Sequence, residues 1–251
     1  MDRIRIGVEW LDRLLPDGFP THSSTLISGP GGSGKPLIGD TVVASWLRQG
    51  GSVVFMSLQY PTTDFITTSL KRVAGLDLAE YAHRTVFLEL DTTRQDWTEV
   101  HPRHLKANLV IPEVWEEVLA EAHHRVPEEG PGILLFASAI NLLLFSPTYG
   151  SQILARLEDM LQHDRRWTLL FSASTTAKAQ EIARLEATAD NLWMTRSEKD
   201  PFRLYLRIVR MKGVRFLSEE ILVPIPPDAL GEVKEVAEHS RKRVIPQIMR
   251  I

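Results

Sequence analysis

The sequence predicts a doubly wound α/β fold with a mostly parallel sheet and an antiparallel extension at its C-terminal side. Several apolar runs lack polar alternation, which is typical of parallel strands covered on both faces. Segments with helical patterns fall between these runs, and such alternation indicates strand–helix–strand units. After residue 191 the pattern changes to strands joined by tight turns.

The elements follow in order along the chain. The expected buried strands share a short apolar run, and they cover residues 24–27, 52–57, 86–90, 132–136 and 168–172. The expected helices share an amphipathic pattern, and they cover residues 36–49, 62–73, 112–125 and 151–163.

The C-terminal part predicts an antiparallel extension of the sheet. Residues 192–195 and 202–209 form the expected hairpin around a turn at 197–201, and 220–223 is a third strand. Polar and apolar residues alternate in 202–209, so one face of that strand is expected to be exposed to water. We therefore expect one domain over residues 1–230 and a mobile, helical, basic tail over 231–251.

Composition excludes several protein classes. The 251 residues are 43% hydrophobic and 24% charged, as in ordinary globular domains, and such a chain buries a core without disulfides. The net charge of −3 provides no overall positive field for nucleic acid. The absence of cysteine excludes disulfides, thiolate metal sites and thiol catalysis.

No apolar run reaches the roughly 18 residues that a membrane-spanning helix needs. The longest candidate, 132–145, contains Ser138 and Asn141, and residues 1–5 lead into no signal-peptide core. We expect a cytoplasmic protein without a membrane segment.

A glycine-rich loop follows the first buried strand and opens a helix. Its glycines and lysine have the spacing of a phosphate-binding loop. Glycines let backbone N–H groups turn toward phosphate oxygens, and the helix N-terminus adds partial positive charge. The lysine would reach the terminal phosphates. The predicted phosphate site consists of Gly29, Gly31, Gly32, Ser33, Gly34, Lys35 and Pro36.

Pro36 departs from the loop pattern. The position normally holds a Ser or Thr whose hydroxyl binds magnesium. Proline has neither that hydroxyl nor a backbone N–H, although it is well tolerated in the first turn of a helix. We therefore expect the fold to survive while the metal site is weakened.

A family resemblance begins before the loop. Gly7, Leu11-Asp12 and Gly18-Phe19-Pro20 resemble the opening of the KaiC-like branch of RecA-type ATPases, which includes RadA-like proteins. The similarity continues through 24–29, resumes at 206–216, and covers most of residues 1–225 but not the tail. It implies a RecA-type core, ATP or ADP as ligand, and rings of six subunits.

Two further positions depart from this family. After the second strand the family carries a catalytic Glu, whereas this chain has Gln59 and Tyr60, and a Gln amide is a poor base. Where the family's Walker B strand ends in Asp, this chain has Ala137, with no acid in 133–140. Together with Pro36, these changes predict no catalytic residue, no magnesium, and weak, metal-independent or absent nucleotide binding.

A basic segment near residue 210 resembles the family's Lys-x-Arg-Gly motif. In rings of the family these side chains reach the neighbouring subunit's nucleotide, so Arg210 and Lys212 are the expected subunit contact. The segment is either a solvated face or a contact with an anion or nucleic acid. Its basic residues are Arg203, Arg207, Arg210, Lys212 and Arg215.

Four histidines are candidates for metal binding, but no carboxylate–histidine spacing supports a site, and we expect none. They are His101, His104, His123 and His124.

The resulting hypothesis is a catalytically degenerate KaiC-like protein, a pseudo-ATPase with a regulatory or assembly role and an unidentified protein partner. One alternative is a slow magnesium-dependent ATPase with Glu89 or Asp91 as a substitute acid. Another is a DNA-binding recombinase paralogue, which the negative net charge disfavours. The resemblance predicts a hexamer, whereas an empty nucleotide site would favour a monomer or dimer.

Overall fold

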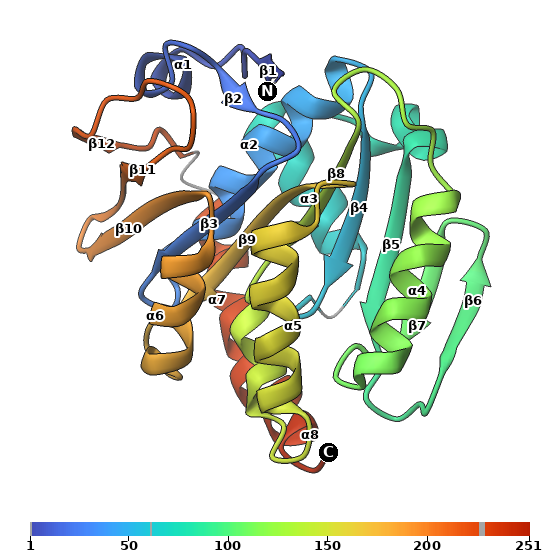
Figure 1. The fold of residues 1–251 in the computed structure, drawn as a ribbon. Coiled ribbons are helices and arrows are strands. Elements are labelled where there is room, and N and C mark those ends of the chain that lie inside the picture. Colours follow the sequence, from blue (N-terminus) through green and yellow to red (C-terminus); the bar gives the residue numbers. More distant parts are fainter. Residues whose placement is uncertain (1, 61, 226–228) are drawn as a thin grey trace.

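A computed structural model describes residues 2–60, 62–225 and 229–251. In this part of the chain one ten-stranded sheet has the order β12-β11-β10-β3-β9-β8-β4-β5-β7-β6, and its central strands are parallel (Figure 1). This confirms the predicted fold class. The five predicted buried strands are β3 (Ser24–Gly29), β4 (Ser52–Ser57), β5 (Thr85–Leu90), β8 (Ile133–Ala137) and β9 (Thr168–Ser174).

Helices cover both faces of the sheet, as the continuous apolar runs require (Figure 1). Successive strand residues face opposite sides, so Val54 and Val53 belong to different apolar clusters. One face packs against α2 (Lys35–Arg48) and α3 (Asp64–Ala74). The other packs against α4 (Pro112–His124), α5 (Gly150–His163) and α6 (Ala179–Thr188).

The N-terminal segment folds against the edge of this core. Asp12 accepts hydrogen bonds from the backbone N–H groups of Ile6 (2.9 Å) and Gly7 (3.0 Å), which fixes the start of the chain against its first helix. The elements are β1 (Arg3–Ile4), α1 (Glu9–Leu14) and β2 (Phe19–Pro20).

The predicted antiparallel extension is confirmed. The strands β10 (Asn191–Lys199), β11 (Phe202–Arg210) and β12 (Glu220–Leu222) pair antiparallel, and β10 joins the sheet parallel to β3. In β11 the side chains of Leu204 and Leu206 are buried, whereas Arg203 and Arg207 are exposed. One face of this strand is therefore exposed to water, as its alternation predicts.

The other edge of the sheet contains a hairpin that the sequence analysis did not predict. The strands β6 (Trp97–His101) and β7 (His104–Ala107) flank a turn at Pro102 and Arg103, and β7 pairs parallel with β5. Proline lacks the backbone N–H that a strand donates to its neighbour in a sheet, so it is accommodated in the turn. The remaining short helices are η1 (Leu78–Arg84) and η2 (Ile140–Phe145).

The C-terminal segment is helical and packs against the core. It comprises α7 (Ala229–His239), the π-helical turn η3 (Ser240–Val244) and α8 (Ile245–Ile248). Apolar residues recur among the basic residues of this segment, and two of them, Val244 and Ile248, are buried in the core. Figure 1 shows the segment beside the carboxyl ends of the parallel strands.

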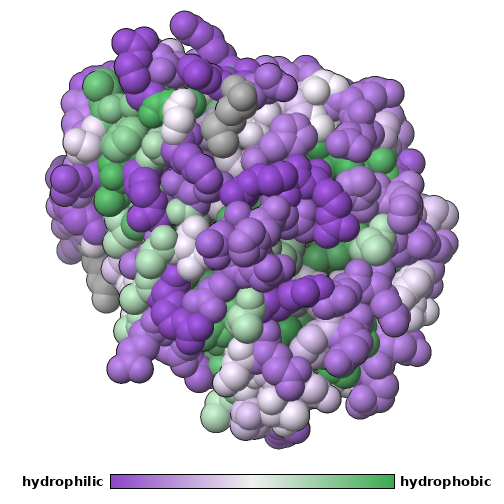
Figure 2. All heavy atoms as spheres, in the orientation of Figure 1, coloured by the Kyte–Doolittle hydropathy of each residue, from purple (hydrophilic) through white to green (hydrophobic). Residues whose placement is uncertain are grey.

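The surface has no dominant apolar feature in the orientation of Figure 2, where small hydrophobic areas are scattered among hydrophilic residues. Among the described residues, no helix combines the length and the apolar character that crossing a membrane requires.

Candidate functional site

The glycine-rich loop joins β3 to α2, where the sequence predicts it. Gly29, Gly32 and Gly34 have positive φ angles of 153°, 72° and 80°. A Cβ atom on Gly29 would lie 2.3 Å from Thr195 Oγ1, so the approach of β10 requires glycine there. The N–H groups of Gly32 and Gly34 donate no hydrogen bond within the described residues. They remain available to an anion.

Lys35 lies across this loop. Its Nζ donates to the carbonyl oxygens of Gly29 (3.0 Å) and Pro30 (2.6 Å) and to Ser33 Oγ (3.2 Å). The residue is only 5% exposed, and burial lowers the pKa of its ammonium group to about 7. A phosphate at the loop would favour the charged form of this lysine.

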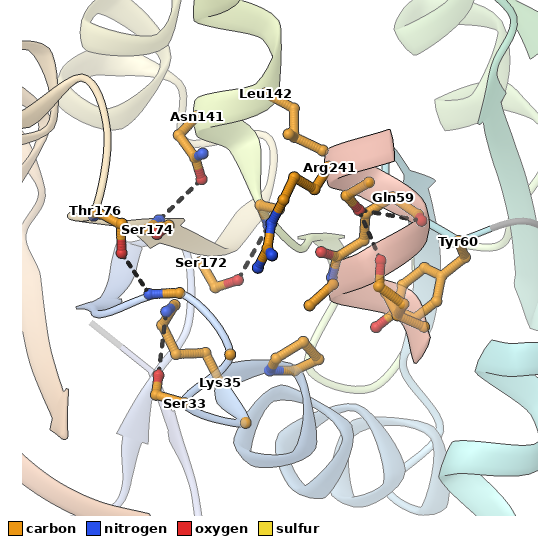
Figure 3. Close-up of a pocket in the computed structure, with 18 of the residues that line it drawn as sticks. Ser33, Lys35, Gln59, Tyr60, Asn141, Leu142, Ser172, Ser174, Thr176 and Arg241 are labelled. Atoms are coloured by element: carbon orange, nitrogen blue, oxygen red, sulfur yellow. Dashed lines mark hydrogen bonds between the residues drawn. The ribbon is translucent and has the colours of Figure 1, made fainter. Parts of the chain in front are cut away.

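A cavity of about 300 Å³ opens above the loop (Figure 3). This volume is at the lower end of the range for small-molecule sites. The loop forms one wall, the ends of β4 and β9 and the start of η2 form the back, and the C-terminal segment closes the opposite side. Lining residues that Figure 3 labels are Ser33, Lys35, Gln59, Tyr60, Asn141, Leu142, Ser172, Ser174, Thr176 and Arg241.

Two segments that lie far apart in the sequence form two walls of this cavity. The loop wall consists of residues 31–37, which the sequence analysis singled out almost entirely. The C-terminal wall consists of Val236, Ala237, Ser240, Arg241 and Ile245, which it missed. Ser240 Oγ also lies 3.5 Å from the backbone oxygen of Gln59, and it donates at 3.0 Å to the backbone oxygen of Val236. Sequence spacing gives no signal for a contact between residues about 200 positions apart.

Gln59 and Ala137 occupy the two strand ends that the family resemblance pairs. The register of β4 and β8 places Met56 opposite Ala137, and Gln59 Nε2 donates to Ser138 Oγ at 2.9 Å. Gln59 and Tyr60 line the cavity. Ala137 is fully buried in the apolar core. The structure therefore brings Gln59 and the residue after Ala137 into contact.

The cavity does not fit a magnesium ion. Its described lining contains no Asp, Glu or His, and its hydroxyl and amide oxygens are neutral. Magnesium is ordinarily held by carboxylate oxygens in addition to substrate phosphates. Pro36 lines the cavity at the position of the missing hydroxyl ligand. Within the described residues, no group of three potential metal ligands occurs anywhere in the fold.

The two candidate substitute acids lie outside the cavity. Glu89 pairs with His104 Nε2 (2.7 Å) and Lys106 Nζ (2.9 Å). Burial would raise the pKa of Glu89, but the hydrogen bonds from His104 and Lys106 outweigh it and lower the pKa. Asp91 accepts a hydrogen bond from Thr93 Oγ1 at 2.6 Å. Neither carboxylate is among the described lining residues.

The other candidate histidines lie beside side chains of the fold. His101 faces His104 in the register of the β6–β7 hairpin. The ring of His123 contacts Trp167 edge to face, with centroids 4.8 Å apart, and lies beside His124.

Arg210 and Lys212 lie away from the loop of their own subunit. Arg210 pairs with Leu192 in the register and donates to the backbone oxygens of Glu186 and Ala189, at the opposite end of β10 from the loop side. Lys212 Nζ lies 2.8 Å from Asp190 Oδ1. Their contact with a neighbouring subunit stays a prediction.

Two of the other basic residues also have acidic partners. Arg203 lies 3.6 Å from Glu198, and Arg215 lies 2.8 Å from Asp17. Arg207 Nε donates to the backbone oxygen of Ser218. These contacts reduce the positive charge that this face presents to nucleic acid.

Known proteins share this fold. A KaiC-like protein of Pyrococcus horikoshii has a TM-score of 0.63 at 17% identity, covering 90% of this chain and 96% of that one. An uncharacterised protein of the same organism, crystallised in complex with an unknown peptide, has a TM-score of 0.63 at 19% identity. That alignment covers 88% of this chain and 98% of the other.

Curated relatives match over a shorter stretch. A UPF0273 protein of Pyrobaculum aerophilum is 32% identical over 90 residues, which is 36% of this chain and 31% of that protein. A UPF0273 protein of Aeropyrum pernix is 29% identical over 92 residues, which is 36% of each. This chain therefore matches about a third of the length of these curated relatives.

The family assignment rests on most of the chain. The family model described as "ATPase: KaiC" matches residues 4–230, a span that contains the loop, the central sheet and the antiparallel extension. The chain belongs to the KaiC family of ATPases.

Proposed function

We propose that this protein binds a nucleoside di- or triphosphate at the loop without magnesium and that it regulates or assembles a partner instead of hydrolysing nucleotide efficiently. The observation that carries the proposal is the absence of any carboxylate among the described residues lining the loop cavity. Membership of the KaiC family implies a nucleotide ligand. Hydrolysis requires a metal, an oriented water and charge stabilisation together.

The phosphate-binding part of the site supports this proposal. The unpaired N–H groups of Gly32 and Gly34 and the ammonium of Lys35 are donors that bind phosphate without a metal. The positions that hold the metal ligands and the catalytic acid in the family lack those groups here. Pro36 has no hydroxyl, Gln59 has no carboxylate, and Ala137 has neither. This chain therefore keeps the groups that bind phosphate and lacks the groups that hydrolysis needs.

Calorimetric titration of ATP and ADP tests the proposal, first in EDTA and then with magnesium. We expect binding in EDTA, little change on adding magnesium, and phosphate release no faster than without protein. Lys35→Ala should weaken binding more than tenfold, because it removes a charged donor. Lys71→Ala, which removes an exposed charge from α3, is the matched control and should leave binding unchanged.

Three outcomes would contradict the proposal. Binding that strictly requires magnesium would restore the slow-ATPase alternative. No binding at millimolar nucleotide would mean that the loop does not serve nucleotides. Equal losses in the two lysine variants would show that the effect is not specific to the loop.

Assembly is part of the same proposal. The family resemblance suggests a ring of six in which Arg210 and Lys212 contact the neighbouring subunit. Light scattering with and without ATP should then show a nucleotide-dependent hexamer that Arg210→Ala weakens. A monomer under both conditions would contradict the ring. The peptide bound to the uncharacterised P. horikoshii protein suggests a protein partner for this chain as well.

A further inference from the structure

The C-terminal wall is held in place by packing. Ile248 is fully buried and Val244 is 8% exposed, and both belong to the core cluster on the α5 face of the sheet. Ser240 Oγ donates to the backbone oxygen of Val236 at 3.0 Å and lies 3.5 Å from that of Gln59, so the π-helical turn contacts the residues that follow β4. The side chains that this segment presents to the cavity are therefore positioned by the fold.

Arg241 is the charged side chain of this wall. Figure 3 shows it extending from its helical segment into the cavity above the loop, toward the side where Ser172 lies. Within the described residues it forms no hydrogen bond and no ion pair. Glu238, three residues earlier, forms an ion pair with Lys242, whose Nζ lies 2.7 Å from Glu238 Oε1. Arg241 acts on Glu238 only through longer-range electrostatic attraction. The guanidinium therefore keeps its donors for a ligand.

Arg241 and Lys35 are the charged residues in the described lining of the cavity, and both are cationic. Lys35 belongs to the loop wall and Arg241 to the C-terminal wall. A nucleoside triphosphate carries several negative charges that a metal ordinarily offsets. Guanidinium offers paired N–H donors that match phosphate oxygens and stays charged at all relevant pH values.

We propose that Arg241 binds the terminal phosphate of the nucleotide held by the loop and provides the counter-charge that magnesium provides elsewhere. This inference rests on the proposed function and adds a binding residue and a preference to it. The guanidinium extends into the space beyond the loop, so it favours a triphosphate over a diphosphate. The C-terminal segment thereby completes the anion site.

The test compares Arg241→Gln with Arg243→Gln in the full-length chain, by calorimetry in EDTA. Arg243 lies two residues further on, is exposed and does not line the cavity, so its variant removes the same charge elsewhere. We expect Arg241→Gln to weaken ATP binding about tenfold or more and ADP binding about threefold or less. Arg243→Gln should change both by less than twofold.

A charge-conserving variant provides a second measurement. Arg241→Lys retains a point charge but loses the paired donors, so ATP affinity should fall between wild type and Arg241→Gln. Thermal unfolding of each variant, measured without nucleotide, separates loss of binding from loss of folding.

The outcomes separate this inference from the proposed function. Wild-type binding in EDTA that Lys35→Ala removes and Arg241→Gln leaves unchanged would overturn the inference and keep the proposed function. Equal losses for ATP and ADP in Arg241→Gln, or equal losses in Arg243→Gln, would also overturn the terminal-phosphate contact. Absence of wild-type binding would overturn both.

Discussion

The loop wall and the C-terminal wall face the same cavity but offer an anion different chemistry. The loop wall presents backbone N–H groups and a lysine that is 5% exposed and already bonded to the loop carbonyls. The C-terminal wall presents an exposed guanidinium on a helical segment anchored by Ile248. The loop wall directly follows a strand end and contains a helix start, whereas the C-terminal wall depends on packing between distant residues. In our proposal the loop wall binds the phosphates and the C-terminal wall sets the preference among nucleotides.

The largest expected effect comes from Gly29, which ends β3 just before the loop wall. Gly29→Ala places a Cβ atom 2.3 Å from Thr195 Oγ1 and 2.4 Å from its backbone oxygen, at a φ of 153°. Overpacking and backbone strain together should lower the free energy of unfolding by about 4 kcal/mol and abolish nucleotide binding. Urea unfolding and calorimetry measure the two effects.

Gly32→Ala is the matched control, since its added Cβ would meet nothing within 4 Å although its φ is 72°. Only the strain remains there, so the free energy of unfolding should fall by about 1 kcal/mol. A loss as large as that of Gly29→Ala would show that steric contact with β10 does not fix the loop.

The next effect breaks the C-terminal wall. Ile248→Ala removes a fully buried side chain and should lower the free energy of unfolding by about 3 kcal/mol. Hydrogen exchange should rise first in the C-terminal segment, and ATP affinity should fall more than ADP affinity. Met249→Ala is the neighbouring control: its side chain is 58% exposed, and its variant should stay within about 0.5 kcal/mol of wild type.

A pH series tests the loop wall, because the pKa of Lys35 lies near neutrality. Burial lowers the pKa of Lys35 to about 7, so the ammonium that binds phosphate is lost as the pH rises above that value. Nucleotide affinity should fall by up to about tenfold per pH unit between 7.5 and 8.5.

The contribution of Lys35 to stability has the opposite sign. Between pH 7 and its ordinary pKa of 10.5, the unfolded chain binds one more proton than the folded chain, so stability rises with pH. In Lys35→Ala both pH effects should disappear. Affinity that is independent of pH in the wild type would show that the ammonium does not contact the ligand.

The smallest expected effect lies outside both walls. Glu89→Gln removes the carboxylate that pairs with His104 and Lys106, and unfolding free energy should fall by about 1 kcal/mol. Nucleotide binding and phosphate release should be unchanged. A loss of magnesium-dependent phosphate release in this variant would instead identify Glu89 as the substitute acid.

Much of the fold follows from local pattern. The apolar run 52–57 coincides with β4, and the expected helix 112–125 differs from α4 by one residue, because burial on both faces leaves a continuous signal. The hairpin β6–β7 was missed because its strands are short and half polar, and their pairing with β5 is what stabilises them.

The candidate site likewise has one part that could be predicted from the sequence and one part that could not. The loop can be predicted from the sequence, since its glycines, Lys35 and Pro36 are contiguous and their backbone geometry is local. The sequence also shows directly that Gln59 and Ala137 stand where the family has acidic residues. That Ser240 and Arg241 line the same cavity as this loop is seen only in the folded chain. Their position depends on where Val244 and Ile248 are buried, and burial against distant elements leaves no fixed spacing in the chain.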